Sequence, residues 1–115
     1  MKILAIDYGR SKIGLATAEG PLAGPWKVVG LNELNEILKK EKFDKLVVGV
    51  SSGTMAEEQK KFAKNIGAET FDETLTTKEA QRLSLEAGMG RKKRRDMEDA
   101  FAAALMLQSY LDSNV

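Results

Sequence analysis

Acidic residues are the candidate catalytic groups of this sequence, because the other side chains that most often perform catalysis are missing. The chain of 115 residues contains no histidine and no cysteine. It therefore lacks the commonest general base, the thiol nucleophile and the side chains that most often bind zinc. Carboxylates remain, and the cations that carboxylates bind best are hard ones such as Mg²⁺.

Two of the acids stand where strands are expected to end. Asp7 closes the apolar segment KILAID at 2–7, and Glu73 follows the segment AETFD at 68–72. Ligands usually bind at the carboxyl ends of parallel strands, so both carboxylates are expected at one edge of a sheet. Each residue could also have a purely structural role. Asp7 can bond local amides in a turn, and Glu73 can be an exposed loop acid.

A second pair of acids, Asp96 and Asp99, precedes an apolar stretch at 100–107. That stretch is apolar all round, which is typical of a helix buried against a sheet. Residues three apart in a helix lie on one side, about one turn apart, so the two carboxylates would be neighbours. Their possible structural role is a place in the first turn of the helix, where acids cap the chain and complement the helix dipole.

Together, the four acids would form a cluster whose mutual repulsion is unfavourable unless cations occupy it. We therefore expect these carboxylates to bind two ions of Mg²⁺ or Mn²⁺. Asp96 is expected to lie beside the other three acids, Asp7, Glu73 and Asp99. Such a pair, roughly 4 Å apart, activates a water molecule and stabilises the leaving oxygen of a phosphodiester. The acids thus predict a nuclease of the two-metal-ion type.

A run of basic residues, RKKRR at 91–95, lies directly before these last two acids. The whole chain carries a net charge of only +1, so the remainder of the chain is net negative and the positive charge is segregated. Clustered Lys and Arg bind polyanions by releasing counterions, although the run could also be a solvated loop between Gly90 and the last helix. The residues expected to contact nucleic acid are Arg10, Lys12, Arg91, Lys92, Lys93, Arg94 and Arg95.

The elements that must position these residues follow from periodicity and turn signals. Strands are expected at 2–7, 12–18, 26–30, 45–50 and 68–72. Helices are expected at 32–41, from the capping box Thr54 to Glu57 as far as Gly67, from the capping box Thr76 to Glu79 as far as Gly88, and at 96–111. The first three strands are close enough in sequence to form an antiparallel meander. The pattern predicts an α/β fold: a mixed five-stranded sheet, the meander plus two parallel strands, with the first strand central and helices on both faces.

The length predicts a single domain spanning residues 1–115. No apolar run approaches the roughly 18–20 residues of a membrane span, and the start of the chain does not resemble a signal peptide. We therefore expect a cytoplasmic protein with no membrane partner.

Three segments carry a resemblance to a known family. They are IDYGRSKIGLA at 6–16, FDETLTTKEA at 71–80 and DAFAAALMLQSYL at 99–111. In their order and spacing the chain resembles the YqgF (RuvX) family, RNase H-like proteins described as Holliday-junction resolvases and as nucleases that mature the 5′ end of pre-16S rRNA. The resemblance implies that Asp7, Glu73 and Asp99 are the metal-binding acids. Asp96 has no such match and is inferred from helical spacing alone.

The peripheral residues depart from the family pattern, so substrate contacts transfer less well than metal chemistry. Ser11-Lys12 stands where Lys-Arg is common, Thr74 replaces an arginine, and GVSSGTM at 49–55 replaces a longer loop. The expected function is metal-dependent cleavage of structured nucleic acid, in the first place 5′-end processing of pre-16S rRNA. The second possible reaction is cleavage of Holliday junctions. A resolvase should act as a dimer, whereas rRNA trimming could proceed with a monomer.

Two other classes of protein share part of this pattern. An actin-like or sugar-kinase ATPase begins with a similar strand-aspartate-glycine motif but needs a second such domain to enclose the nucleotide. A non-catalytic nucleic-acid-binding module would need the basic run but not convergent carboxylates.

Overall fold

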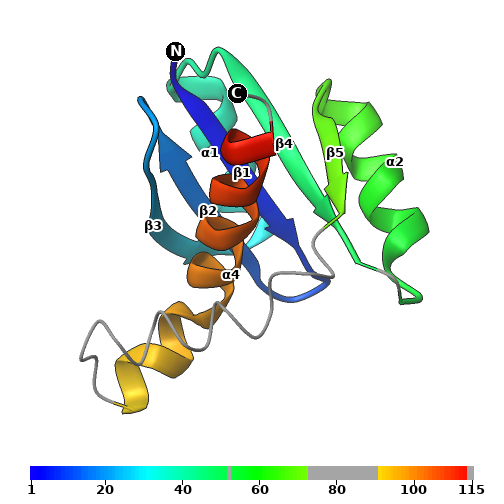
Figure 1. Ribbon diagram of the computed structural model, residues 1–115. Coiled ribbons are helices and arrows are strands. Elements are labelled where there is room, and N and C mark those ends of the chain that lie inside the picture. Colours follow the sequence, from blue (N-terminus) through cyan, green and yellow to red (C-terminus); the bar gives the residue numbers. More distant parts are fainter. Residues whose placement is uncertain (52, 73–90, 114–115) are drawn as a thin grey trace.

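The protein is built on one mixed sheet of five strands in the order β3-β2-β1-β4-β5 (Figure 1). The computed structural model describes residues 1–51, 53–72 and 91–113, with side chains from residue 97 onward in the last segment. The strands are β1 (Ile3–Tyr8), β2 (Ile13–Ala18), β3 (Ala23–Val29), β4 (Lys45–Val50) and β5 (Glu69–Asp72). The first three pair antiparallel, whereas β4 runs parallel to β1 and β5 parallel to β4. The predicted mixed sheet with a central first strand is confirmed.

Helices cover both faces of the sheet, as predicted (Figure 1). α1 (Leu31–Lys40) and α2 (Ala56–Ile66) cover one face, and α4 (Arg91–Ser113) covers the other. The helix predicted between Thr76 and Gly88 lies outside the described residues. No helix in the described ranges is long and apolar enough to cross a membrane.

The alternation of side chains along β1 divides the core into two clusters. Leu4 and Ile6 are fully buried and pack with α1 and α2. Ile3 and Ala5 point to the other face and pack with α4. A strand that is apolar on both faces must be covered on both sides, which is why β1 lies at the centre.

The predicted capping box at the start of α2 is not formed. The residue before the helix is Met55, already in a right-handed helical conformation, and no side chain caps the helix. The chain enters the helix through a turn in which the Ala56 amide donates to the Gly53 carbonyl over 3.2 Å, so Thr54 is not the N-cap. The predicted end of the helix is confirmed, because Gly67 adopts the left-handed conformation (φ 73°) that terminates it.

The prediction for the start of α4 is also wrong. The helix begins at Arg91 and includes the whole basic run, which the loop interpretation had placed outside it. Lys and Arg are good helix formers, so they extend the helix despite their mutual repulsion. No acid stands in the first turn, which removes the dipole and capping roles for Asp96 and Asp99. The helix is regular at Asp96, one turn before Asp99.

Candidate active site

Asp7 lies near the carboxyl end of β1, on the face covered by α4. Successive side chains of a strand alternate between faces, so Asp7 shares its face with Ile3 and Ala5. It is half-buried. Its partner on β2 is Gly14, and partners in an antiparallel pair lie roughly 5 Å apart and point to the same face.

Helix α4 touches the sheet directly at this glycine. A Cβ atom on Gly14 would overlap the backbone carbonyl of Asp99 and would stand 2.8 Å from the amide nitrogen of Ala100. Ala100 is fully buried and Asp99 half-buried. The structure therefore brings the backbone of Asp99 against the residue that pairs with Asp7, so two of the predicted acids belong to neighbouring backbone segments near the carboxyl end of β1.

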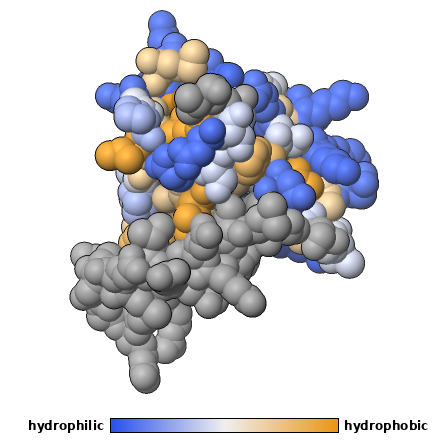
Figure 2. All heavy atoms as spheres, viewed as in Figure 1, coloured by the Kyte–Doolittle hydropathy of each residue, from blue (hydrophilic) through white to orange (hydrophobic). Residues whose placement is uncertain are grey.

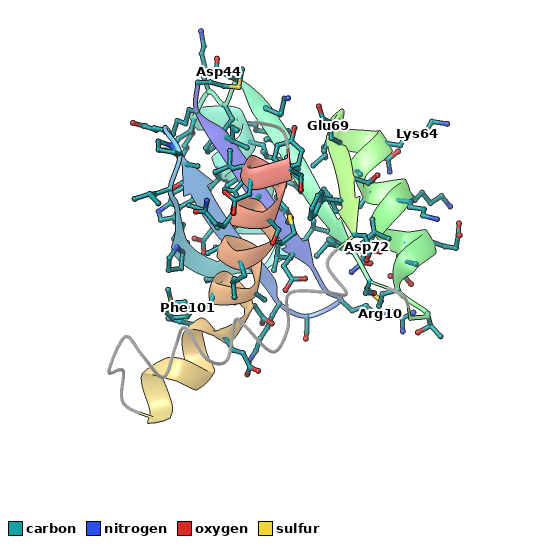
Figure 3. The ribbon with its side chains drawn as sticks, in the orientation of Figure 1. Arg10, Asp44, Lys64, Glu69, Asp72 and Phe101 are labelled. Atoms are coloured by element: carbon teal, nitrogen blue, oxygen red, sulfur yellow. The ribbon has the colours of Figure 1, made fainter. Side chains whose placement is uncertain are left out.

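The other two predicted acids are only partly covered by the described residues. Glu73 lies outside them, although it directly follows β5, whose last residue Asp72 pairs with Val50 at the end of β4 (Figure 3). Asp96 has its backbone in α4, but its side chain is outside the description. Within the described part of the chain, no group of three acidic side chains could hold a metal ion. The carboxylate cluster as a whole therefore stays a prediction.

Arg10, a predicted nucleic-acid contact, is paired within the protein. Its Nη2 lies 2.8 Å from Oε1 of Glu58 on α2, and its Nε donates to Oε2 over 3.5 Å. The hydrogen bond, reinforced by the charge of the guanidinium, lowers the pKa of Glu58, and the same contact raises the pKa of Arg10. Both side chains are well exposed, so this pair is of the kind that solvent screens strongly. Lys12, the other predicted contact in this turn, is exposed.

Sequence reasoning missed Gln59, which joins the ends of two strands. It is 3% exposed and is the one buried polar side chain among the described residues. Its Oε1 accepts from the Ser51 amide at 2.8 Å and from the Ser51 hydroxyl at 3.2 Å, and its Nε2 donates to the Tyr8 carbonyl at 3.1 Å. Gln59 thus ties the end of β1, next to Asp7, to the end of β4. The available signal was its helical spacing from Ala63 and Ile66, which places it on the inner face of α2.

The outer face of α2 is charged and exposed, unlike its buried inner face. Its exposed residues include Glu57, Lys60, Lys61 and Lys64, and hydrophilic side chains gather over this helix in Figure 2. The inner face of α2 contacts the end of β1 through Gln59 and through the stacked rings of Tyr8 and Phe62, whose centroids lie 4.4 Å apart.

The basic run lies in the first turns of α4, which project beyond the sheet (yellow in Figure 1). These turns directly precede the point where α4 meets Gly14. A helical basic segment beside the candidate acids is compatible with a nucleic-acid interface, although the side chains of residues 91–96 are outside the description.

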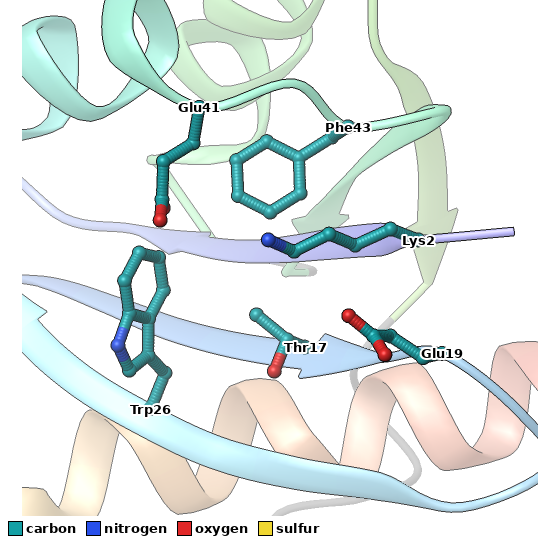
Figure 4. Close-up of a pocket in the computed structure, with 6 residues that line it drawn as sticks. All are labelled: Lys2, Thr17, Glu19, Trp26, Glu41 and Phe43. Carbon is teal, nitrogen blue, oxygen red and sulfur yellow. The ribbon is translucent and has the colours of Figure 1, made fainter.

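A pocket of about 250 Å³ lies at the opposite end of β1 (Figure 4). Its lining residues are Lys2, Thr17, Glu19, Trp26, Glu41 and Phe43. The Lys2 ammonium extends into it and lies 4.9 Å from the centre of the Phe43 ring. Lys2 lies five positions before Asp7, roughly 17 Å along the strand direction, so this pocket is not part of the candidate site.

Comparison with known proteins agrees with the sequence resemblance. A family model described as "RuvX: Holliday junction resolvase" matches residues 1–113. A protein of Pelotomaculum thermopropionicum named "Putative pre-16S rRNA nuclease" is 35% identical over 136 residues, which covers 98% of this chain and 88% of the relative. A protein of the same name from Streptococcus sanguinis is 35% identical over 139 residues, with 99% of each chain covered. These matched stretches are longer than the 115-residue chain, so the relatives contain residues without a counterpart here.

The fold is likewise shared with a solved structure. "T. thermophilus RuvC in complex with Holliday junction substrate" superposes with a TM-score of 0.58 at 18% identity, over 100% of this chain and 97% of that one. This likeness confirms the predicted RNase H-like fold. The family match over residues 1–113, together with the relatives at 35% identity, shows that the chain belongs to the RuvX family of nucleases, hydrolases that act on phosphodiester bonds.

Proposed function

We propose that this chain, as one nuclease domain spanning residues 1–115, processes the 5′ end of pre-16S rRNA in a metal-dependent reaction. The names of its relatives supply the substrate. The observation that carries the catalytic part is the contact of α4 with Gly14, because it sets Asp99 beside the strand partner of Asp7.

The chemistry of the proposed ligands fits a hard divalent cation. Asp7 and Asp99 are half-buried carboxylates held on two separate elements, and Glu73 follows a third that ends at the same edge of the sheet. Oxygen ligands of this type are those that Mg²⁺ and Mn²⁺ prefer. When bound as a pair, such ions would activate water and stabilise the leaving oxygen of the phosphodiester.

The part played by the chain itself is to hold these carboxylates at fixed positions. Asp7 is held by β1, whose end is tied to β4 through Gln59, and Asp99 is held by the packed backbone of α4. Asp96, one turn earlier, would orient a metal-bound water from outside the main ligand set.

The basic run would hold the phosphate backbone without reading its sequence. Changing Lys92, Lys93 and Arg94 to Ala should weaken binding of unrelated nucleic acids about equally and flatten the salt dependence of affinity by up to about one unit of slope per lost contact. Binding titrations at several salt concentrations measure this. The matched control changes Lys60, Lys61 and Lys64 on the outer face of α2, which should leave the slope as it is. A slope unchanged by the first set would show that the run is solvated helix surface.

Holliday-junction cleavage is the second candidate reaction, favoured by the description of the matching family. A cleavage assay that offers a pre-16S leader RNA and a mobile four-way DNA junction side by side tests both. We expect cleavage of the RNA by wild type and by the control variant Glu36→Gln, which changes an exposed residue of α1, and no cleavage in EDTA. Cleavage of the junction alone would favour a resolvase, and binding without cleavage of either substrate would favour a non-catalytic module.

Oligomeric state separates the two reactions further. Symmetric cutting of a four-way junction needs two active sites, so a resolvase should be a homodimer, whereas rRNA trimming needs one site and a monomer suffices. Light scattering at the assay concentration measures this. A chain that acts on rRNA precursors would work in the cytoplasm.

A further inference from the structure

We propose that Gly14 is a positioning residue for the metal site: because it has no side chain, α4 can lie on β2 and hold Asp99 beside Asp7. The inference rests on the proposed function, since it takes Asp7 and Asp99 to be metal ligands. It adds a third position, which binds no metal itself but sets the distance between two residues that do.

The contact at Gly14 leaves no room for a methyl group. A Cβ atom there would overlap the Asp99 carbonyl and approach the Ala100 amide nitrogen to 2.8 Å. These are backbone atoms, which cannot rotate aside as the end of a flexible side chain could. A residue larger than glycine must therefore move either the strand or the helix.

The strand is the more firmly held of the two at this level. The neighbours of Gly14 on β2, Ile13 and Leu15, are 2% and 0% exposed and pack into the cluster on the opposite face. Gly14 is also paired on both sides, with Asp7 on β1 and with Val28 on β3. A displacement is consequently expected in the helix.

Among the described residues, the side-chain hydrogen bonds that hold the helix to the sheet lie farther along, at Gln108 and Tyr110. Gln108 binds the β2–β3 turn through the Ala23 amide and the Pro21 carbonyl, both at 2.9 Å. The Tyr110 hydroxyl donates to Glu69 at 2.7 Å and accepts from Lys45 at 3.0 Å. With these residues held, a side chain at position 14 would move Asp99 away from Asp7 more than it would move the end of α4.

The chain offers a matched control in Gly24. This glycine lies in β3 and pairs with Thr17, and no atom of the described residues lies within 4 Å of the position of an added Cβ. Gly24→Ala therefore makes the same chemical change in a neighbouring strand of the same sheet without a collision.

The test is Mn²⁺ binding by isothermal titration calorimetry, with the intact chain and no nucleic acid. Gly14→Ala should weaken Mn²⁺ binding by about 10–100-fold, the loss typical when a residue that orients a ligand is removed. Gly24→Ala should bind Mn²⁺ as wild type does. Leu34→Ala, which creates a cavity on the far face, should lower the unfolding temperature and leave the Mn²⁺ affinity unchanged, so loss of stability alone does not explain the effect.

The outcomes separate the positioning role from the metal site itself. If Asp7→Asn binds Mn²⁺ as tightly as wild type, the proposed site is wrong whatever Gly14 does. If Asp7→Asn loses binding while a folded Gly14→Ala retains wild-type affinity, the positioning role is overturned. Should Gly14→Ala fail to fold, Ala100→Val takes its place, since it enlarges a fully buried residue at the same level of α4. Wild-type affinity in that variant would then overturn the proposal.

Discussion

The two faces of the sheet are packed with side chains of different size. The strands facing α1 and α2 contribute large residues: Leu4, Ile6, Ile13, Leu15, Val29 and Val48. On the face covered by α4, the strands contribute two larger residues, Ile3 and Val47, and otherwise the small residues Ala5, Ala16 and Ala18, together with Gly14 at the contact with Asp99. Large side chains keep a helix at a distance from the strands, whereas alanine and glycine let its backbone approach them. Both faces thus bury apolar side chains, and the second in addition brings the backbone of an acidic residue on a helix against the strand residue that pairs with Asp7.

The largest expected effect is at the acid of the closely packed face. Asp7→Asn should abolish cleavage, because a metal ligand is lost, and should leave the unfolding temperature equal or higher, because a repulsive charge is removed. Activity and thermal unfolding are measured on the same preparation. Full activity in this variant, or wild-type activity undiminished in EDTA, would remove the catalytic role from this face.

A substitution on the face covered by α1 and α2 should lower the stability of the fold and leave the cleavage rate unchanged. Leu34 is fully buried on α1, and its replacement by Ala should cost about 2–5 kcal/mol of unfolding free energy, from lost burial and the cavity left behind. At a temperature where the variant is folded, its turnover should match wild type. A large fall in turnover under those conditions would show that the two faces are not separate in function. Urea unfolding and initial rates supply both quantities.

A smaller effect is expected one turn from Asp99. Asp96→Asn should raise the Mg²⁺ concentration for half-maximal cleavage by about 10–100-fold, as is typical for a residue that supports a metal ligand. Asp99→Asn should show no activity at any Mg²⁺ concentration. If Asp96→Asn follows the wild-type curve throughout the titration, only Asp7, Glu73 and Asp99 remain as candidate ligands.

The smallest expected effect is on the α2 side of the site. Glu58→Gln removes the charged partner of Arg10 and should raise affinity for nucleic acid by no more than a few-fold, because exposed ion pairs contribute little. If Glu58→Gln leaves the affinity for nucleic acid unchanged, Arg10 does not contact the substrate.

The pair of Arg10 and Glu58 also makes the stability of the fold depend slightly on pH. The pKa of Glu58 is lowered in the folded chain, so its small stabilising contribution is present above the ordinary value of 4.5 and is lost as the pH falls through the lowered pKa.

Much of the fold could be predicted from the sequence, because it depends on local patterns. The apolar residues on both faces of β1 indicated a central strand, and the short connections indicated a meander; both are confirmed. Gly67 was identified as a helix end because a left-handed residue there is a local requirement. The start of α4 differs from the prediction: a basic run after Gly90 is compatible with a loop, but Lys and Arg are good helix formers and the helix includes them.

The sequence by itself determined which residues could do chemistry: four acids, a basic run, and neither histidine nor cysteine. Only the tertiary structure decided that the backbone of Asp99 lies on Gly14, opposite Asp7. A glycine in a strand indicates a close approach but not its partner, and here the partner is far away in the chain. Gln59 is a second example: its helical spacing from Ala63 fits an inner face of α2, but its bonds to Tyr8 and Ser51 exist only where the ends of β1 and β4 come together. Such contacts depend on which elements the sheet order makes neighbours, and no local pattern contains that information.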